Sequence, residues 1–167
     1  MFRPSLLLSA ILFLLFLFLK NRIMKNKKQA VVYQAFINAG FSIDLAKLLT
    51  AQSAFETANF TSKLFKTQNN LNGMKEAKLR DTTDIDEGYI LAEAGVQKAD
   101  SVGYSEYHSI NEAALDMRKY WLSFKLPEYF DSVKDFCAAL KNKGYFEASL
   151  SGYTIGVKYY YSLYYGG

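Results

Sequence analysis

The stretch "AFETANFTSKLFKTQNNLNGMK", from Ala54 to Lys75, places one acid among apolar residues and then continues into a polar turn. The acid, Glu56, comes at the end of a predicted helix, with Phe55 and Phe60 beside it. Apolar burial disfavours the charged form of a carboxyl group and therefore raises its pKa. Such an acid can donate a proton near neutral pH, and the asparagines of the following turn can orient a sugar. The stretch therefore predicts half of a glycosidase site.

Helical spacing of apolar residues dominates the chain on both sides of this stretch. The first pattern closes at Gly40, a typical C-terminal stop, and the second begins with Ser42 as an N-cap. A capping-box pattern, Ser109-x-x-Glu112, opens a later helix that Pro127 ends. The predicted helices cover residues 29–40, 41–58, 109–124, 130–144 and 151–165.

The segment from Asn69 to Tyr107 has no long helical pattern and is rich in glycine and acids. We expect short strands or a lid-like loop here, because long irregular segments in a compact domain usually carry function. A solvated acidic loop is the plainer interpretation of its acids. Its acids include Asp81, Asp84, Asp86, Glu87 and Glu93.

Charge and composition exclude several classes of function. Residues 1–28 hold six Lys and Arg residues and no acid, whereas residues 29–167 hold 14 basic and 16 acidic residues. The predicted domain therefore lacks the basic face of a nucleic-acid binder. One cysteine, Cys137, and one histidine, His108, exclude a disulfide and the usual zinc site, so we expect no metal or cofactor. We expect Cys137 to be buried and His108 to lie in a loop. Nothing in the sequence defines an oligomeric state.

The N-terminal segment is apolar from Leu6 to Leu19 and is followed by a basic tether. It is shorter than the roughly 20 residues of a typical spanning helix, and its length also suits a signal peptide. No Ala-x-Ala-like cleavage site follows, so we expect a retained single-pass helix that inserts residues 5–19 into lipid. Residues 1–28 would be the anchor and tether, and residues 29–167 the domain. The positive charges after the segment favour a cytoplasmic domain, whereas a domain that faces the cell wall would need the opposite orientation or transport in a phage particle.

The opening stretch resembles the signature of the glucosaminidase family, glycoside hydrolase family 73, which is E-[ST]-G-x-[FW]-x-S followed by N-N-L-F-G-[IM]-K. The matching residues are Glu56, Thr57, Asn59, Phe60, Ser62, Asn69, Asn70, Leu71, Gly73, Met74 and Lys75. Two positions depart from the pattern: Ala58 replaces the usual glycine, and Asn72 the usual phenylalanine.

Two later stretches are also similar to family motifs. Tyr107, Ser109, Glu112, Ala113 and Asp116 fit F-x-x-Y-x-S-x-x-E-[AS]-x-x-D. Gly144, Tyr145 and Tyr153 fit the late G-Y-A-T-D-x-x-Y segment if two residues are inserted before its last tyrosine, and the Thr-Asp pair of the segment is missing. The resemblance spans about residues 30–160.

The resemblance implies a mainly helical, α+β lysozyme-like fold, with a cleft between a helical body and a small lobe. It implies hydrolysis of the β-1,4 bond after N-acetylglucosamine in peptidoglycan. Glu56 aligns with the general acid of the family and Tyr107 with a tyrosine that lines the sugar site. We expect Asn70, Phe60 and Tyr145 to contribute to substrate binding. The tyrosine-rich end of the chain suits either packing or a sugar-stacking wall.

Three routes of hydrolysis stay open at this point. The resemblance implies a second carboxylate in the small lobe, and the candidates are Asp81, Asp84, Asp86, Glu87 and Glu93, of which we favour Asp84 and Glu87. A second carboxylate roughly 5–5.5 Å from the first suits a covalent retaining route, and roughly 6.5–9.5 Å leaves room for an inverting water. Assistance by the acetamido group of the sugar needs no second carboxylate. Two other functions also remain: a wall-binding module without catalysis, and a lytic transglycosylase, which would leave 1,6-anhydro-muramyl ends.

Overall fold

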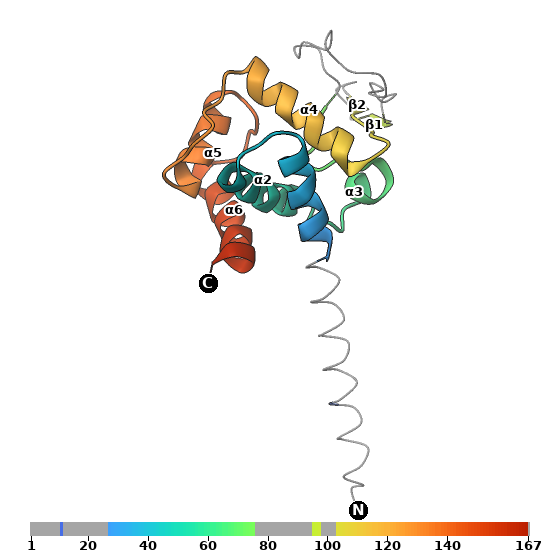
Figure 1. Cartoon of the computed structure of the whole chain (residues 1–167), viewed down its shortest axis with the longest axis horizontal. Coiled ribbons are helices and arrows are strands. Elements are labelled where there is room, and N and C mark those ends of the chain that lie inside the picture. The colour runs from blue at the N-terminus through green and yellow to red at the C-terminus, as the bar shows by residue number, and fades with distance from the viewer. Residues whose placement is uncertain (1–10, 12–26, 76–94, 98–102, 167) are drawn as a thin grey trace, which may run out of the picture.

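The structure is a computed structural model that describes residues 11, 27–75, 95–97 and 103–166. Within that part the chain is mainly helical, with a helix over residues 27–38 and five further helices. Their bounds are α2 Ile43–Glu56, α3 Lys63–Gln68, α4 Ile110–Ser123, α5 Val133–Asn142 and α6 Leu150–Tyr165. Figure 1 shows α2 at the centre of the body, with α4 across one side and α5 and α6 along another. The mainly helical class is therefore confirmed.

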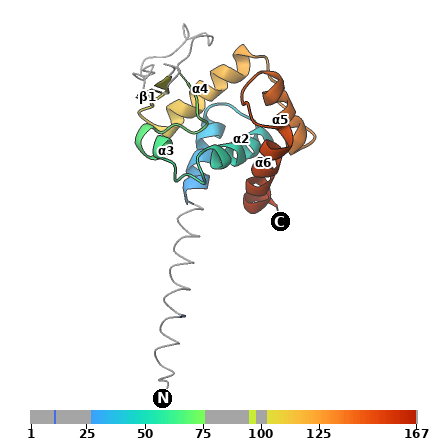
Figure 2. The ribbon, with the colours of Figure 1, turned by 180° about the vertical axis from the view of Figure 1, so that it is seen from behind.

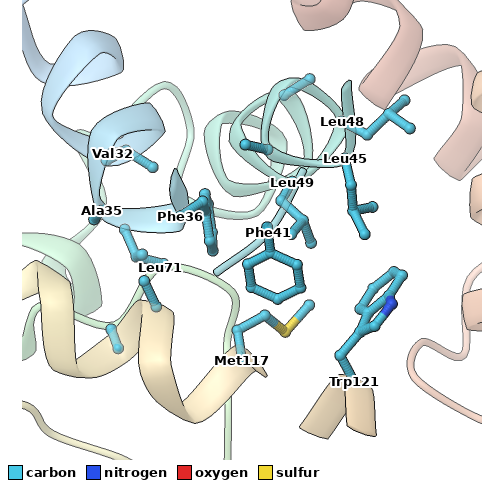
Figure 3. Close-up of a cluster of buried hydrophobic side chains, with 14 of the residues drawn as sticks. Val32, Ala35, Phe36, Phe41, Leu45, Leu48, Leu49, Leu71, Met117 and Trp121 are labelled. Carbon is cyan, nitrogen blue, oxygen red and sulfur yellow. The ribbon is translucent and has the colours of Figure 1, made fainter. Parts of the chain in front are cut away.

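Helix α2 is buried on nearly all sides, which explains its composition. Leu45, Leu49, Ala51 and Ala54 are all buried, together with polar residues of the same helix. A helix that is apolar all round belongs in a core. Figure 3 shows Phe41 packed between the leucines of α2 and the side chains of α4. The rings of Phe41 and Trp121 meet edge to face at 5.9 Å.

The helix ends follow the predicted capping signals. Ser42 and Ser109 are the N-caps of α2 and α4, and their hydroxyl oxygens accept from backbone N–H groups three residues later. Gly40 and Gly144 follow helices with φ of +85° and +72°, the left-handed conformation that glycine adopts without steric cost. In the capping box of α4, the Glu112 carboxylate accepts from the backbone N–H of His108 at 2.8 Å.

The predictions for Cys137 and His108 also hold. Cys137 is buried on α5, where burial raises the pKa of its thiol to about 11. His108 lies in an exposed bend before α4. Within the described residues, no group of three or more metal-ligating side chains occurs.

A short antiparallel pair of strands represents the small lobe in the described part of the chain. Strand β1, Gly95–Gln97, pairs with β2, Gly103–Tyr104, and Lys75 forms a bridge to Tyr104. Figure 2 shows β1 near α3, at the end of the body away from α5 and α6. The segment 76–94 lies outside the described residues, and the cleft between body and lobe stays a prediction.

The two ends of the described domain meet. Gln29 donates to the hydroxyl of Tyr165 at 2.9 Å, and the rings of Tyr33 and Tyr165 lie 6.2 Å apart. Lys28 donates to the backbone carbonyl of Phe60 at 2.9 Å, which ties the first helix to the turn after Glu56. The predicted domain boundary between residues 28 and 29 falls inside this helix. The predicted anchor, residues 5–19, lies outside the described residues except for Ile11, and the helices that are described are too short or too polar to cross a bilayer.

Candidate active site

Glu56 is the last residue of α2, and a tight turn follows it. Three consecutive residues, Ala58, Asn59 and Phe60, have φ between +48° and +60°. The backbone N–H of Asn59 reaches back to the Ala54 carbonyl at 2.6 Å. This turn returns the chain to the body and buries Phe60 completely. Glu56 is thereby left at an edge, exposed over part of its surface.

The conformation of Ala58 gives the family pattern a physical reason. Its φ of +48° lies in the left-handed region, which costs a non-glycine residue roughly 1–2 kcal/mol. Glycine is free of that cost, which explains its usual presence at this position of the motif. The alanine here keeps the turn at the expense of some stability.

Tyr153 of α6 holds the carboxyl group of Glu56. Its hydroxyl donates to Oε1 of Glu56 at 2.6 Å and accepts from Nε2 of Gln52 at 3.1 Å. The Tyr153 ring stacks on Phe146 at 3.6 Å and meets the edge of Phe55 at 5.2 Å. Aromatic contacts on two sides therefore fix the hydroxyl that faces the acid.

Burial raises the pKa of Glu56, and the hydrogen bond from Tyr153 lowers it by a smaller amount. Part of the residue is exposed, yet protein atoms surround its carboxyl group closely enough to remove much of its hydration. Burial and the negative charge of Glu56 raise the pKa of Tyr153, so this phenol keeps its proton. The arrangement places a protonated phenol against an acid whose pKa burial raises.

Asn70 organises the second half of the motif. Its Nδ2 donates to the carbonyls of Met74 and Ser105, both at 2.8 Å. Its Oδ1 accepts from the backbone N–H groups of Met74 at 3.0 Å and Asn72 at 3.3 Å. Asn70 has no exposed surface, so this amide joins the turn to the strand segment opposite. A substrate contact by Asn70 stays a prediction, and these bonds favour a structural role.

The other predicted substrate contacts surround this turn. Phe60 packs on Phe65 in the core, with ring centroids 5.4 Å apart. Tyr107 is buried and donates to the Asp116 carboxylate at 2.5 Å. Tyr145 is half-buried and donates to the Asn72 carbonyl at 2.7 Å. Of these three side chains, that of Tyr145 keeps the most exposed surface.

The departure at Asn72 is accommodated by a polar contact. Its Oδ1 accepts a short hydrogen bond from the hydroxyl of Ser53, one turn before Glu56 on α2. The predicted second carboxylates, Asp84 and Glu87, lie outside the described residues and stay predictions. The sequence interpretation gave no role to Gln52 or Tyr153. Two features of the sequence could have indicated these residues. Gln52 lies one helical turn before Glu56, and Tyr153 matches a tyrosine of the late family motif.

Comparisons with known proteins show the family and the fold of this chain. The family model described as glucosaminidase, mannosyl-glycoprotein endo-beta-N-acetylglucosaminidase, matches residues 34–163. A chain in a solved type VI secretion system effector–immunity complex from Pseudomonas protegens is similar in fold, with a TM-score of 0.51 and 18% identity. The alignment covers 83% of this chain and 91% of that one. A search of curated protein sequences found no match. Because the family model covers most of the sequence, the chain belongs to the glucosaminidase family and is a glycoside hydrolase that acts on peptidoglycan.

Proposed function

We propose that this enzyme cleaves the β-1,4 bond after N-acetylglucosamine in peptidoglycan, with Glu56 as the general acid. The observation that carries the proposal is the carboxyl group of Glu56, which stands at the end of α2 with a raised pKa and a hydrogen bond from Tyr153. Glycosidic cleavage needs a protonated acid beside the leaving oxygen, and this environment favours that form.

Glu56 has the same first task in each of the three routes. Its proton passes to the leaving oxygen as the glycosidic bond breaks and positive charge develops on the sugar ring. A second carboxylate, for which Asp84 and Glu87 are our candidates, would then act as nucleophile or activate water. The acetamido group of the sugar would replace it in a substrate-assisted route. Asp84→Asn and Glu87→Gln variants separate a route through one of these carboxylates from the substrate-assisted route, because only the former makes activity depend on one of them.

The variant Glu56→Gln tests the proposal. The amide keeps the shape of the side chain and can still accept from Tyr153, but it cannot act as an acid. We expect hydrolysis to fall by roughly 10²–10⁴-fold, the usual contribution of a positioned acid. Glu147→Gln, which removes an exposed acid of the loop before α6, is the matched control and should keep wild-type activity. An unchanged rate in Glu56→Gln would exclude Glu56 as the acid.

The products test the bond that is cleaved. The full-length protein should release fragments with new N-acetylglucosamine reducing ends from defined peptidoglycan, as measured by mass spectrometry. New N-acetylmuramic acid reducing ends would place the cut at the other β-1,4 bond. Anhydro-muramyl ends would show transglycosylation instead.

We also propose that residues 5–19 anchor the enzyme in a membrane as a single-pass helix, with residues 29–167 as the catalytic domain. The apolar run from Leu6 to Leu19 and the basic tether after it support this assignment. Alkaline carbonate extraction of membranes checks it, because an inserted chain stays with the lipid and a peripheral one is released. Protease protection then shows whether the domain faces the wall, as catalysis requires.

A further inference from the structure

Three side chains from two helices form one hydrogen-bonded row that ends at the acid. Gln52 and Glu56 lie one turn apart on α2, and both bond to the hydroxyl of Tyr153 on α6. Gln52 has no exposed surface and Tyr153 is 3% exposed, so water does not compete at the inner end of the row. The outer end is the carboxyl group of Glu56, which reaches the edge of the domain.

The hydrogen bonds of this row all run in one direction, from Gln52 through Tyr153 to Glu56. An amide nitrogen only donates, so the oxygen of Tyr153 must accept from Nε2 of Gln52. The phenol of Tyr153 can then still donate one hydrogen bond through its O–H. The acceptor within reach is Oε1 of Glu56, at 2.6 Å. A proton on Oε1 would face the proton of Tyr153. The row therefore excludes Oε1 as the atom that carries the acid proton.

We propose that Gln52 and Tyr153 are positioning residues that occupy Oε1 of Glu56 and reserve Oε2 for the proton given to the leaving group. This inference rests on the proposed role of Glu56. It gives Gln52 a task in the reaction although Gln52 touches no reacting atom. Oε2 is then the oxygen that must face the glycosidic bond.

Few charged groups act on this row in the described part of the chain. Tyr153 is the titratable group that α6 directs at Glu56, and Tyr145 in turn faces Tyr153. Asp44 and Lys47 of α2 pair with each other in the first turns of the helix, away from Glu56 at its end. The hydrogen bond from Tyr153 favours the carboxylate and lowers the pKa of Glu56 against the effect of burial. Loss of this bond must therefore raise the pKa.

The test measures the pKa of Glu56 directly. The full-length protein in detergent micelles is labelled with ¹³C at glutamate carboxyl groups and titrated by NMR, with Glu56→Gln to assign the signal. We expect the pKa of Glu56 to rise in Tyr153→Phe. We expect a smaller rise in Gln52→Met, because the hydroxyl of Tyr153 is then free to turn away. In each variant, the pH at which activity is lost on the alkaline side should rise by as much as the pKa of Glu56 rises in that variant.

Matched variants separate this result from a general structural effect. Tyr164→Phe removes another hydroxyl of α6, which bonds to Asn59, and Gln34→Met removes an exposed amide from the first helix. Neither should change the pKa of Glu56. An unchanged pKa in Tyr153→Phe or in Gln52→Met overturns the inference, and the second variant still decides if the first does not fold. Full activity of Glu56→Gln would instead refute the proposed function and leave the titration result valid.

Discussion

Replacing Gly156 with alanine would force a methyl group into the ring of Phe55, the residue directly before the proposed acid. A Cβ atom at Gly156 would lie 2.2 Å from Cε2 and 2.4 Å from Cδ2 of that ring. Carbon atoms in good contact are about 3.5–4.0 Å apart. Either the ring or helix α6 must therefore move by more than an ångström.

The expected cost follows from two opposing effects. Overpacking of a close contact costs about 1–3 kcal/mol, whereas alanine in place of glycine inside a helix gains about 1 kcal/mol. Gly156→Ala should therefore lower the free energy of unfolding by about 0–2 kcal/mol. For a chain of this size, each kcal/mol lowers Tm by roughly 2–4 °C.

The larger effect should be on catalysis. Phe55 meets Tyr153 edge to face at 5.2 Å, and Tyr153 holds Glu56. A displaced ring therefore moves the phenol that positions the acid. Misplacement of a catalytic group by about 1 Å can cost roughly 10²-fold in rate, so we expect kcat to fall by up to that factor. Thermal melts and the release of reducing ends from peptidoglycan measure the two effects.

Two further variants make this test decisive. Gly152→Ala lies one turn earlier on α6, where the new Cβ meets only the Ser149 hydroxyl at 3.1 Å, and it should keep full activity. In the double variant Gly156→Ala/Phe55→Leu, the leucine side chain at position 55 can move away from the new methyl group. The alanine should therefore no longer destabilise the protein. Our reasoning fails if Gly156→Ala behaves like Gly152→Ala in both assays.

Other substitutions test the turns and the acid. Ala58→Gly should stabilise the protein by up to about 1 kcal/mol, since relief of the left-handed strain outweighs the greater freedom of glycine when unfolded, and urea unfolding should detect it. Asn70→Ala should cost about 3–5 kcal/mol by the same measurement, because it leaves several buried backbone groups without their partner. Because the pKa of Glu56 is raised on folding, the folded state loses stability as pH rises through and above its ordinary value of 4.5. Glu56→Gln should therefore gain Tm relative to wild type at pH 7 but not at pH 4, and an equal difference at both values would contradict the raised pKa.

Local signals predicted the helix ends well. Ser42, Ser109, Gly40 and Gly144 act within a few residues of the chain, so their effect can be recognised in the sequence itself. The position of Glu56 at the end of α2 was predictable for the same reason. Its family motif then made Glu56 the candidate acid.

Contacts between distant segments were not predictable in this way. Tyr153 and Glu56 are separated by 97 positions, and their hydrogen bond depends on how α6 packs against α2. Asn70 illustrates a second limit, since an asparagine beside an acid suits sugar binding and turn formation equally well. Its four bonds to backbone groups became visible only once the turn and the segment near Ser105 were placed together.

The bond between Lys28 and the Phe60 carbonyl has a practical consequence for anyone preparing a soluble form of the enzyme. A truncation that begins at Gln29 removes the ammonium group of Lys28, which bonds to the bend next to the acid, and it cuts into the helix described over residues 27–38. Such a protein can fold and still be a poor catalyst for reasons unrelated to lipid. Trimming should therefore stop upstream of residue 27, so that loss of activity reports on the missing anchor and not on the missing bond of Lys28.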